Sequence, residues 1–295
     1  MNNCRSRAGR QALALRAATA VARRHGLLAS EPRVLSDCNN TIVHLAPLPV
    51  VAKVCHTRQR PAGAAALSVE LAIAQHLAGA GAPVVPPSQE LSATVHWDSE
   101  QALTFWRYQE REPESAFDPG SARRALRDVH AVLDRYRAPL PSFLDRQVRR
   151  AGRLLADPTA LPALPPGDRD FLTAEHRRLT GAIRGRQLDP HTLHGDPHRG
   201  NFLVRRGRHL LIDFESACSG PVEWDLSALP AGGADPISAD PDLLAILRRL
   251  RSLCVAVWCK SNALRSPELD CSGSLHLAVL RRRQATEEPR QPLVA

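Results

Sequence analysis

A short polar run, LHGDPHRGNFLV from Leu193 to Val204, concentrates side chains that can do chemistry just before an apolar segment. It contains Asp196 and, five positions further on, Asn201. A second run, LLIDFE, ends in the carboxylates of Asp213 and Glu215. Carboxylates can take protons from hydroxyl groups, and carboxylate and amide oxygens are ligands that suit Mg²⁺. The two runs therefore predict a catalytic base next to a metal site.

The spacing between the runs predicts that their polar groups meet. FLV, RRGR and HLLIDF form a pattern typical of a hairpin that turns at Gly207. Because a hairpin places the start of one strand beside the end of the next, Asn201 and Asp213 should lie close together and share a metal ion. Asp196, one loop earlier, is left to accept a proton from a hydroxyl nucleophile. Glu215 is a candidate for a supporting group around the metal.

A lysine within a strand completes the set. The 39 basic residues include two lysines, Lys53 and Lys260. Lys53 interrupts the apolar strand VVAKV, where a charge needs a partner, and Glu70 in the helical pattern LSVELAIAQ is the expected one. Phosphoryl transfer needs a base for the acceptor hydroxyl, metal on the phosphates and a cation on the nucleotide. These residues therefore predict phosphoryl transfer.

The elements that must position these groups fall into three predicted segments. Residues 1–26 are arginine-rich and read as an amphipathic first helix, with a transit peptide as the alternative. Residues 27–108 carry strand signals, among them a hairpin of Thr41–Leu45 with Val50–Val54, and form a β-rich lobe with a hinge near 104–111. Residues 112–295 are dominated by helical patterns and form a second, larger lobe.

The motifs HGDPHRGN and IDFE, together with VVAKV and the following helical glutamate, resemble the aminoglycoside phosphotransferase and choline kinase family. This resemblance extends from about Arg33 to Arg283. It implies an α+β, protein-kinase-like two-lobed fold with a small antiparallel β N-lobe and a larger helical C-lobe. It also implies an ATP-dependent, Mg²⁺-dependent enzyme that phosphorylates a hydroxyl of a small molecule, with aminoglycoside-, choline- and sugar-like acceptors all open.

Residue by residue, the resemblance implies that Asp196 is the catalytic base and that Asn201 and Asp213 bind Mg²⁺. It implies that Lys53 contacts the nucleotide phosphates and pairs with Glu70. The remaining residues that it assigns are Trp106 and Tyr108 at the hinge that holds the adenine, and His194 and Asp225 as supports of the catalytic loop.

One departure concerns the segment before the first predicted strand. LSDCNNTIVHL has no glycine where a phosphate-covering loop is expected. Ser36, Asn39 and Asn40 are expected to supply side-chain donors there, and asparagine tolerates left-handed turns. This departure keeps open the alternative of a catalytically weak or inactive nucleotide-binding regulator with the same fold.

Composition argues against other classes. The net charge of +9 and pI near 9.8 suit nucleic-acid binding, but the arginines are scattered and aromatic residues make up 4%, so no nucleic-acid partner is expected. No apolar run reaches about 18 residues, so no membrane span is expected. Seven cysteines without a CxxC pair fit free thiols in a reducing cytoplasm. The oligomeric state stays open.

A rival with its own chemistry is a metal-dependent hydrolase. The run from His191 to His198 could nominally ligate zinc or two metal ions through its histidines and Asp196. This hypothesis gives no role to Asn201, to Lys53 or to the carboxylate of the IDF run. Phosphoryl transfer is therefore the favoured prediction.

Overall fold

The computed structural model describes residues 6–56, 62–230 and 237–287, and the chain forms two compact units. Among the described residues, the first unit comprises those up to 138 and 196–217, and the second comprises the rest. The polar hairpin thus belongs to the first unit. The predicted segment boundaries at 26, 108 and 112 follow the sequence alone and stay a prediction. Residues 1–5 of the predicted first segment lie outside the described residues.

The first unit begins with the predicted amphipathic helix, α1 (Arg7–Arg24). The side chain of Ser6 accepts a hydrogen bond from the N–H of Gly9 and caps the helix. The positive charges of Arg23 and Arg24 in the last turn stabilise the helix by interacting with the negative end of its dipole. Small apolar side chains form its buried stripe, so α1 packs closely: Ala14, Ala17, Ala18, Val21 and Ala22.

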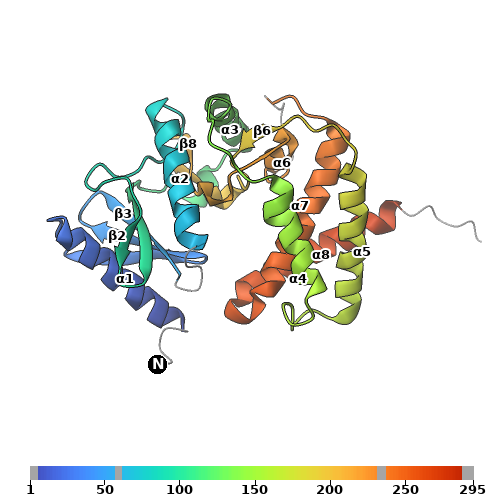
Figure 1. Ribbon diagram of the computed structural model, residues 1–295, viewed down its shortest axis with the longest axis horizontal. Coiled ribbons are helices and arrows are strands. Elements are labelled where there is room, and N and C mark those ends of the chain that lie inside the picture. Colours follow the sequence, from blue (N-terminus) through green and yellow to red (C-terminus); the bar gives the residue numbers. More distant parts are fainter. Residues whose placement is uncertain (1–5, 57–61, 231–236, 288–295) are drawn as a thin grey trace, which may run out of the picture. The chain divides into compact units, whose positions relative to one another are not determined.

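A five-stranded antiparallel sheet follows, in the order β1-β2-β3-β5-β4. Its strands β2 and β3 are labelled in Figure 1. The predicted hairpin is confirmed, because β2 pairs with β3 in antiparallel register. The bounds of the strands are β1 (Glu31–Asp37), β2 (Asn40–Ala46), β3 (Val50–Cys55), β4 (His96–Asp98) and β5 (Gln101–Arg107).

Strand β1 corrects the sequence analysis, which placed LSDC in the segment before the first predicted strand. β1 is an edge strand, and most of its residues are at least partly exposed. Such a strand lacks the apolar alternation by which strands are recognised, and an edge tolerates Pro32. A bulge between Val34 and Ser36 interrupts its pairing with β2.

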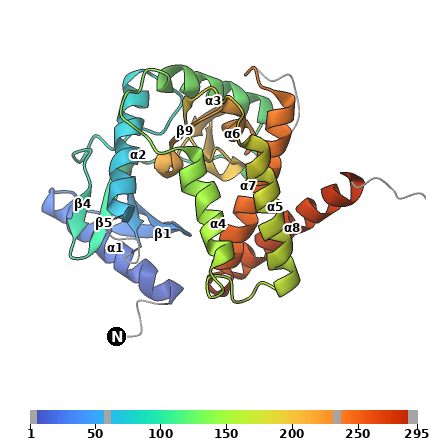
Figure 2. The same ribbon diagram turned by 45° about the vertical axis from the view of Figure 1, so that its right-hand side comes forward.

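The two faces of the sheet carry different side chains, because alternate residues of a strand point to opposite sides. On one face, Ala52 and Val54 join the core that α1 covers (Figure 2). On the other face, Cys55 and Ala102 pack with Leu67 of α2 (Ala62–Gly79). Lys53 lies between Ala52 and Val54 in sequence, so its side chain leaves the sheet on the α2 face.

The predicted hairpin at Gly207 is confirmed as β7 (Phe202–Arg205) paired with β8 (Arg208–Leu211). Gly207 has φ 71°, which favours glycine at the turn. Leu211 donates its N–H to Pro83 O over 2.9 Å and accepts from Val85 N, so the end of β8 is fixed beside the segment that follows α2. The first unit also contains α3 (Pro119–Leu133) and 3-10 turns at Glu114–Ala116, Arg199–Asn201 and Phe214–Ser216.

The second unit is mainly helical, as predicted for the C-terminal part, and the α+β class is confirmed. Leu172 and Leu179 of α5 belong to the same buried apolar cluster as Leu247 and Leu250 of α7 and Trp224 of α6. The bounds of its elements are α4 (Arg149–Ala156), α5 (Pro166–Ile183), α6 (Val222–Leu226), α7 (Pro241–Ser261), α8 (Pro267–Glu287), a π-helical turn (Leu144–Val148), a 3-10 turn (Ala263–Arg265), β6 (His191–Leu193) and β9 (Cys218–Gly220).

Within the described ranges, no helix has the length and apolarity needed to cross a membrane. The cysteines of these ranges form no disulfide. Cys4 lies outside the described residues.

A buried ionic contact links two helices of the second unit. The carboxylate of Glu175, on α5, accepts hydrogen bonds from the guanidinium groups of Arg178 and, across to α7, of Arg249. Burial alone would raise the pKa of Glu175, but the hydrogen bonds and charges of the two arginines together hold that pKa below its usual range.

Replacing Glu175 with glutamine is expected to destabilise the protein by roughly 3 kcal/mol near neutral pH, because Arg249 then keeps a buried charge without its counterion. Since the carboxyl has a depressed pKa in the folded state, its contribution is present above the unfolded-state pKa and is lost as pH falls through the folded-state pKa. Urea unfolding at neutral and at acidic pH measures this. The difference between parent and variant should shrink in acid, and an unchanged difference would contradict the assignment.

Candidate active site

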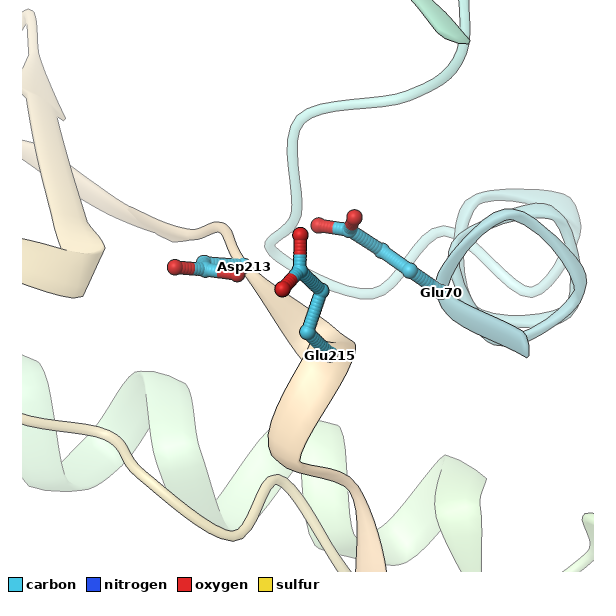
Figure 3. A group of neighbouring side chains, drawn as sticks. All are labelled: Glu70, Asp213 and Glu215. Carbon is cyan, nitrogen blue, oxygen red and sulfur yellow. The ribbon is translucent and has the colours of Figure 1, made fainter. Parts of the chain in front are cut away.

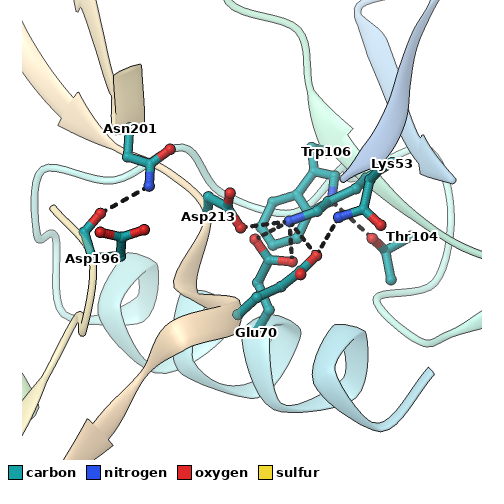
Figure 4. Close-up of polar contacts among 9 residues, drawn as sticks. Lys53, Glu70, Thr104, Trp106, Asp196, Asn201 and Asp213 are labelled. Carbon is teal, nitrogen blue, oxygen red and sulfur yellow. Dashed lines mark hydrogen bonds and ion pairs between the residues drawn. The ribbon is translucent and has the colours of Figure 1, made fainter. Parts of the chain in front are cut away.

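The ammonium group of Lys53 lies at the centre of a polar cluster (Figure 4). Lys53 faces Thr104 across β3 and β5, and its side chain is 8% exposed. Its Nζ lies 2.8 Å from Oε2 of Glu70, on α2. The same atom lies 2.8 Å from Oδ1 of Asp213 and 2.7 Å from Oε1 of Glu215. The expected contact with Glu70 is therefore present, and two carboxylates from the segment after β8 join it.

The three carboxylates form a compact group of oxygen donors, with one oxygen of each within 4.8 Å of the others (Figure 3). Burial alone would lower the pKa of Lys53, but the three carboxylates outweigh it and raise that pKa well above the usual lysine range. Burial also raises the pKa of Glu70, and repulsion from Asp213 and Glu215 adds to this. One positive charge faces three acidic groups, an arrangement that suits a divalent cation bound through oxygen.

Asp213 owes its position to an unusual backbone conformation. β8 ends at Leu211, and Asp213 has φ 68° and ψ 62°, in the left-handed region. This conformation costs a non-glycine residue energy, and aspartate is among the residues that adopt it most readily. It leads the chain from the strand directly into the 3-10 turn that carries Glu215. Sequence reasoning missed it, because an aspartate after an apolar run gives no signal of its φ angle.

Asn201 joins the hairpin to Asp196. Its Nδ2 donates to the backbone oxygen of Asp196 over 2.9 Å, and its own backbone oxygen accepts from Ile212 N over 3.0 Å. The backbone of Asn201 is therefore hydrogen-bonded to Ile212, the residue before Asp213, as the hairpin geometry predicts. Because the amide nitrogen faces Asp196, the amide oxygen lies on the side away from it (Figure 4). That oxygen has the chemistry of a metal ligand.

The three predicted phosphate donors lie at and beside the turn between β1 and β2: Ser36 is in β1, Asn39 is in the turn and Asn40 begins β2. Ser36 and Asn39 are exposed, whereas Asn40 is buried. The Nδ2 of Asn40 donates to Oε1 of Glu215 over 2.6 Å. The structure thus brings Asn40 to the polar cluster, while Ser36 and Asn39 have solvent-facing side chains.

Asp37 fixes this turn, and sequence reasoning missed it. Its carboxylate is fully buried and accepts from Thr41 Oγ1 over 2.8 Å. It also contacts Arg10 of α1 at 3.3 Å and His56 at 3.2 Å. A turn that lacks glycine is thus held by a polar network. Aspartate is common at the first position of a turn, which is the signal that could have identified it.

The predicted hinge residues lie at the end of β5, Trp106 within the strand and Tyr108 just after it. Trp106 lies two residues from Thr104 on the same face of the sheet and donates from Nε1 to its Oγ1 over 2.9 Å. The N–H of Tyr108 donates to Pro49 O over 2.8 Å, and its ring stacks on His44 with centroids 3.8 Å apart. Burial lowers the pKa of His44 and favours its neutral form. The backbone at the hinge is thus tied to the turn between β2 and β3.

Asp225 and His194 lie in the second unit and are both fully buried. The carboxylate of Asp225 accepts from the N–H groups of His194 and Gly195 at 2.9 and 2.8 Å. Asp225 therefore holds the two residues that precede Asp196 in the chain.

The histidines of the rival hydrolase hypothesis have other contacts. His191 pairs with Asp189, and Nδ1 of His198 accepts from Gly200 N as a cap of a 3-10 turn. In the part of the chain that the structure describes, the one group of three or more acidic, histidine or cysteine side chains placed to hold a metal ion is that of Glu70, Asp213 and Glu215. The histidine-based metal site is therefore not supported.

Solved structures with the same fold define the class. The amicoumacin kinase hAmiN, in complex with AMP-PNP, Ca²⁺ and Ami, matches 93% of this chain and 95% of its own at 16% identity, with a TM-score of 0.66. The choline kinase LicA from Streptococcus pneumoniae matches 90% of this chain and 98% of its own at 14% identity, with a TM-score of 0.66. The GDP and kanamycin complex of APH(2")-IIia matches 92% and 98% at 18% identity, with a TM-score of 0.65. The fold is therefore that of the protein-kinase-like phosphotransferases.

The model of the phosphotransferase enzyme family matches residues 10–255, and the chain belongs to this family. The resemblance inferred from the sequence motifs is thereby confirmed. Among curated proteins, a sequence search finds no relative.

Proposed function

We propose that the protein is a small-molecule kinase that transfers the γ-phosphate of ATP to a hydroxyl group with the help of Mg²⁺. The observation that carries this proposal is the convergence of Lys53 with Asp213 at the end of a hairpin that starts at Asn201. The ligands of similar structures support it, since one holds AMP-PNP, Ca²⁺ and Ami, and another holds GDP and kanamycin.

Asp213 and Asn201 are the proposed metal ligands. A carboxylate oxygen and the amide oxygen opposite the bonded Nδ2 fit Mg²⁺, which prefers a few protein oxygens together with phosphate oxygens. Held by Asp213 and Asn201, Mg²⁺ would supply positive charge that offsets the negative charge of the phosphates. Glu70 would hold the side chain of Lys53 in place. The ammonium group of Lys53, which lies beside Asp213, would contact the nucleotide phosphates. Glu215 would add negative charge that favours the cation.

Asp196 is the proposed base. Its carboxylate would accept the proton of the acceptor hydroxyl while the hydroxyl oxygen attacks the γ-phosphorus. The bond from the γ-phosphorus to the β–γ bridging oxygen breaks, and ADP leaves with that oxygen. Most of the rate enhancement would come from alignment of the reactants and from neutralised phosphate charge.

The hinge supplies the proposed purine site. The N–H groups of Arg107 and Tyr108 donate to Pro86 and Pro49. Among the described residues, no acceptor takes the next N–H along the chain, that of Gln109. It is therefore a main-chain donor that could bind a base beside Trp106.

The proposal is tested by measuring nucleotide consumption with ATP and with GTP, against amino alcohols, choline, sugars and aminoglycosides, followed by mass spectrometry of the acceptors. Mg²⁺-dependent formation of a phosphate ester on at least one acceptor class is expected. Nucleotide binding without transfer to any acceptor would favour the inactive regulator instead.

A further inference from the structure

The peptide group before Asp196 is held by an unusual number of side chains. The backbone oxygen of Gly195 accepts hydrogen bonds from Nε2 of Gln147 at 3.2 Å, from Nε1 of Trp224 at 3.1 Å and from Nη2 of Arg251 at 3.1 Å. A carbonyl oxygen has two lone pairs, so three donors over-determine its direction. They come from three separate elements, the π-helical turn, α6 and α7.

Arg251 is the central member of this group. It is 4% exposed, and its Nε donates to Ser227 Oγ at 2.7 Å. Its Nη2 also donates to Trp224 O at 2.7 Å, and its guanidinium lies 4.0 Å from the centre of the Trp224 ring. These contacts fix the planar guanidinium in one orientation, which a lysine ammonium could not reproduce.

The burial of a cation at this place needs an explanation. Moving a charge out of water is costly, and an apolar side chain of similar volume would often stabilise a core as well or better. Nη2 of Arg251 instead donates to two backbone oxygens, and one of these belongs to Gly195, the residue before the proposed catalytic base. A donor in this position can orient the Gly195–Asp196 peptide group.

We propose that Arg251, together with Gln147 and Trp224, positions Asp196 by fixing the plane of the Gly195–Asp196 peptide. This inference rests on the proposed role of Asp196 as the base. Because a peptide unit is planar, holding the oxygen of Gly195 also fixes the N–H of Asp196. The backbone oxygen of Asp196 accepts in turn from His198 N and Asn201 Nδ2, both at 2.9 Å. Both peptide groups that flank its Cα are thus held by named donors.

The backbone of Gly195 agrees with this role. Its φ of 89° lies in the region that favours glycine, so the turn into Asp196 has a shape that another residue would strain. Its N–H donates to Asp225 while its oxygen takes the three donors. The peptides on either side of this glycine are therefore both anchored in the second unit.

The test compares Arg251→Lys with Arg249→Lys, a matched control. Both arginines are buried on α7, but Arg249 contacts Glu175 and Leu280 O rather than the peptide before Asp196. We expect Arg251→Lys to lower kcat by about 10- to 100-fold, since a misplaced catalytic group costs up to about 100-fold, with ATP affinity changed less than about 2-fold. Arg249→Lys should lower thermal stability and leave kcat of the folded enzyme within about 2-fold.

Gln147→Met provides a second variant, because Gln147 is only partly buried and its replacement removes one donor without disturbing the core. A kcat lowered by several fold at unchanged ATP affinity is expected. If Arg251→Lys fails to fold, the kcat of Gln147→Met decides whether the positioning role is correct. If Asp196→Asn abolishes turnover while the Arg251 and Gln147 variants match the control in kcat, the positioning role is wrong and the proposed function stands. If Asp196→Asn retains parental turnover, the proposed base is wrong, and the positioning role is overturned with it.

Discussion

The Asp196→Asn variant should lose about 10²- to 10⁴-fold in kcat while it binds ATP with near-parental affinity. Asparagine keeps the size of the side chain and leaves the backbone contacts of residue 196 to His198 and Asn201 in place. It cannot take a proton from the acceptor hydroxyl. The loss should therefore appear in the chemical step and not in nucleotide binding.

Steady-state kinetics with calorimetric ATP titration separates the two effects. A matched control is Asp189→Asn, the same change at a side chain that is 88% exposed and pairs with His191 in the preceding segment. The control should keep its kcat within about 2-fold of the parent. Parental turnover in Asp196→Asn would rule out Asp196 as the base.

The Lys53→Met variant is expected to weaken ATP binding by roughly 10- to 100-fold, which corresponds to the loss of a charge-assisted contact to phosphate. Lys53 is the cation at the centre of the cluster, within 3.0 Å of oxygens of three acidic residues. Methionine fills a similar volume in the strand but removes the cation that the three acids share. Glu70, whose pKa burial already raises, should then take up a proton.

Calorimetry and thermal unfolding measure both consequences. Lys260→Met is the matched control, because Lys260 is the other lysine of the chain and pairs with Asp270 and Ser274 between α7 and α8. The control should bind ATP as the parent does. If the Lys53 and Lys260 variants bind ATP equally well, Lys53 has no role on the phosphates.

The parts of the site that depend on short spacing could be predicted from the sequence. The hairpin at Gly207 brings Asn201 to the residue beside Asp213 because its two strands are adjacent in the chain. A lysine within an apolar strand demanded a partner, and Glu70 on the next helix is that partner. Both expectations rest on local geometry and on the cost of an unpaired charge.

The parts of the site that depend on distant contacts or on backbone angles could not be predicted from the sequence. Nothing in the sequence signals that Asp213 has φ 68° or that Glu215 reaches both Lys53 and Asn40. The buried network around Asp37 joins Arg10 of α1, Thr41 of β2 and His56, which follows β3, and no local pattern connects these residues. The edge strand β1 was missed for a related reason, because its exposed residues carry no apolar alternation.

The Mg²⁺ dependence of ATP affinity tests the central claim most directly, because Asp213, Asn201 and Lys53 are proposed to receive one metal–triphosphate. Calorimetric titration of the parent with ATP, with Mg²⁺ and with a chelator instead, should show markedly tighter binding when the metal is present. In Asp213→Asn this gain should disappear. Equal ATP affinity with and without Mg²⁺ in the parent, or an undiminished gain in Asp213→Asn, would contradict the account.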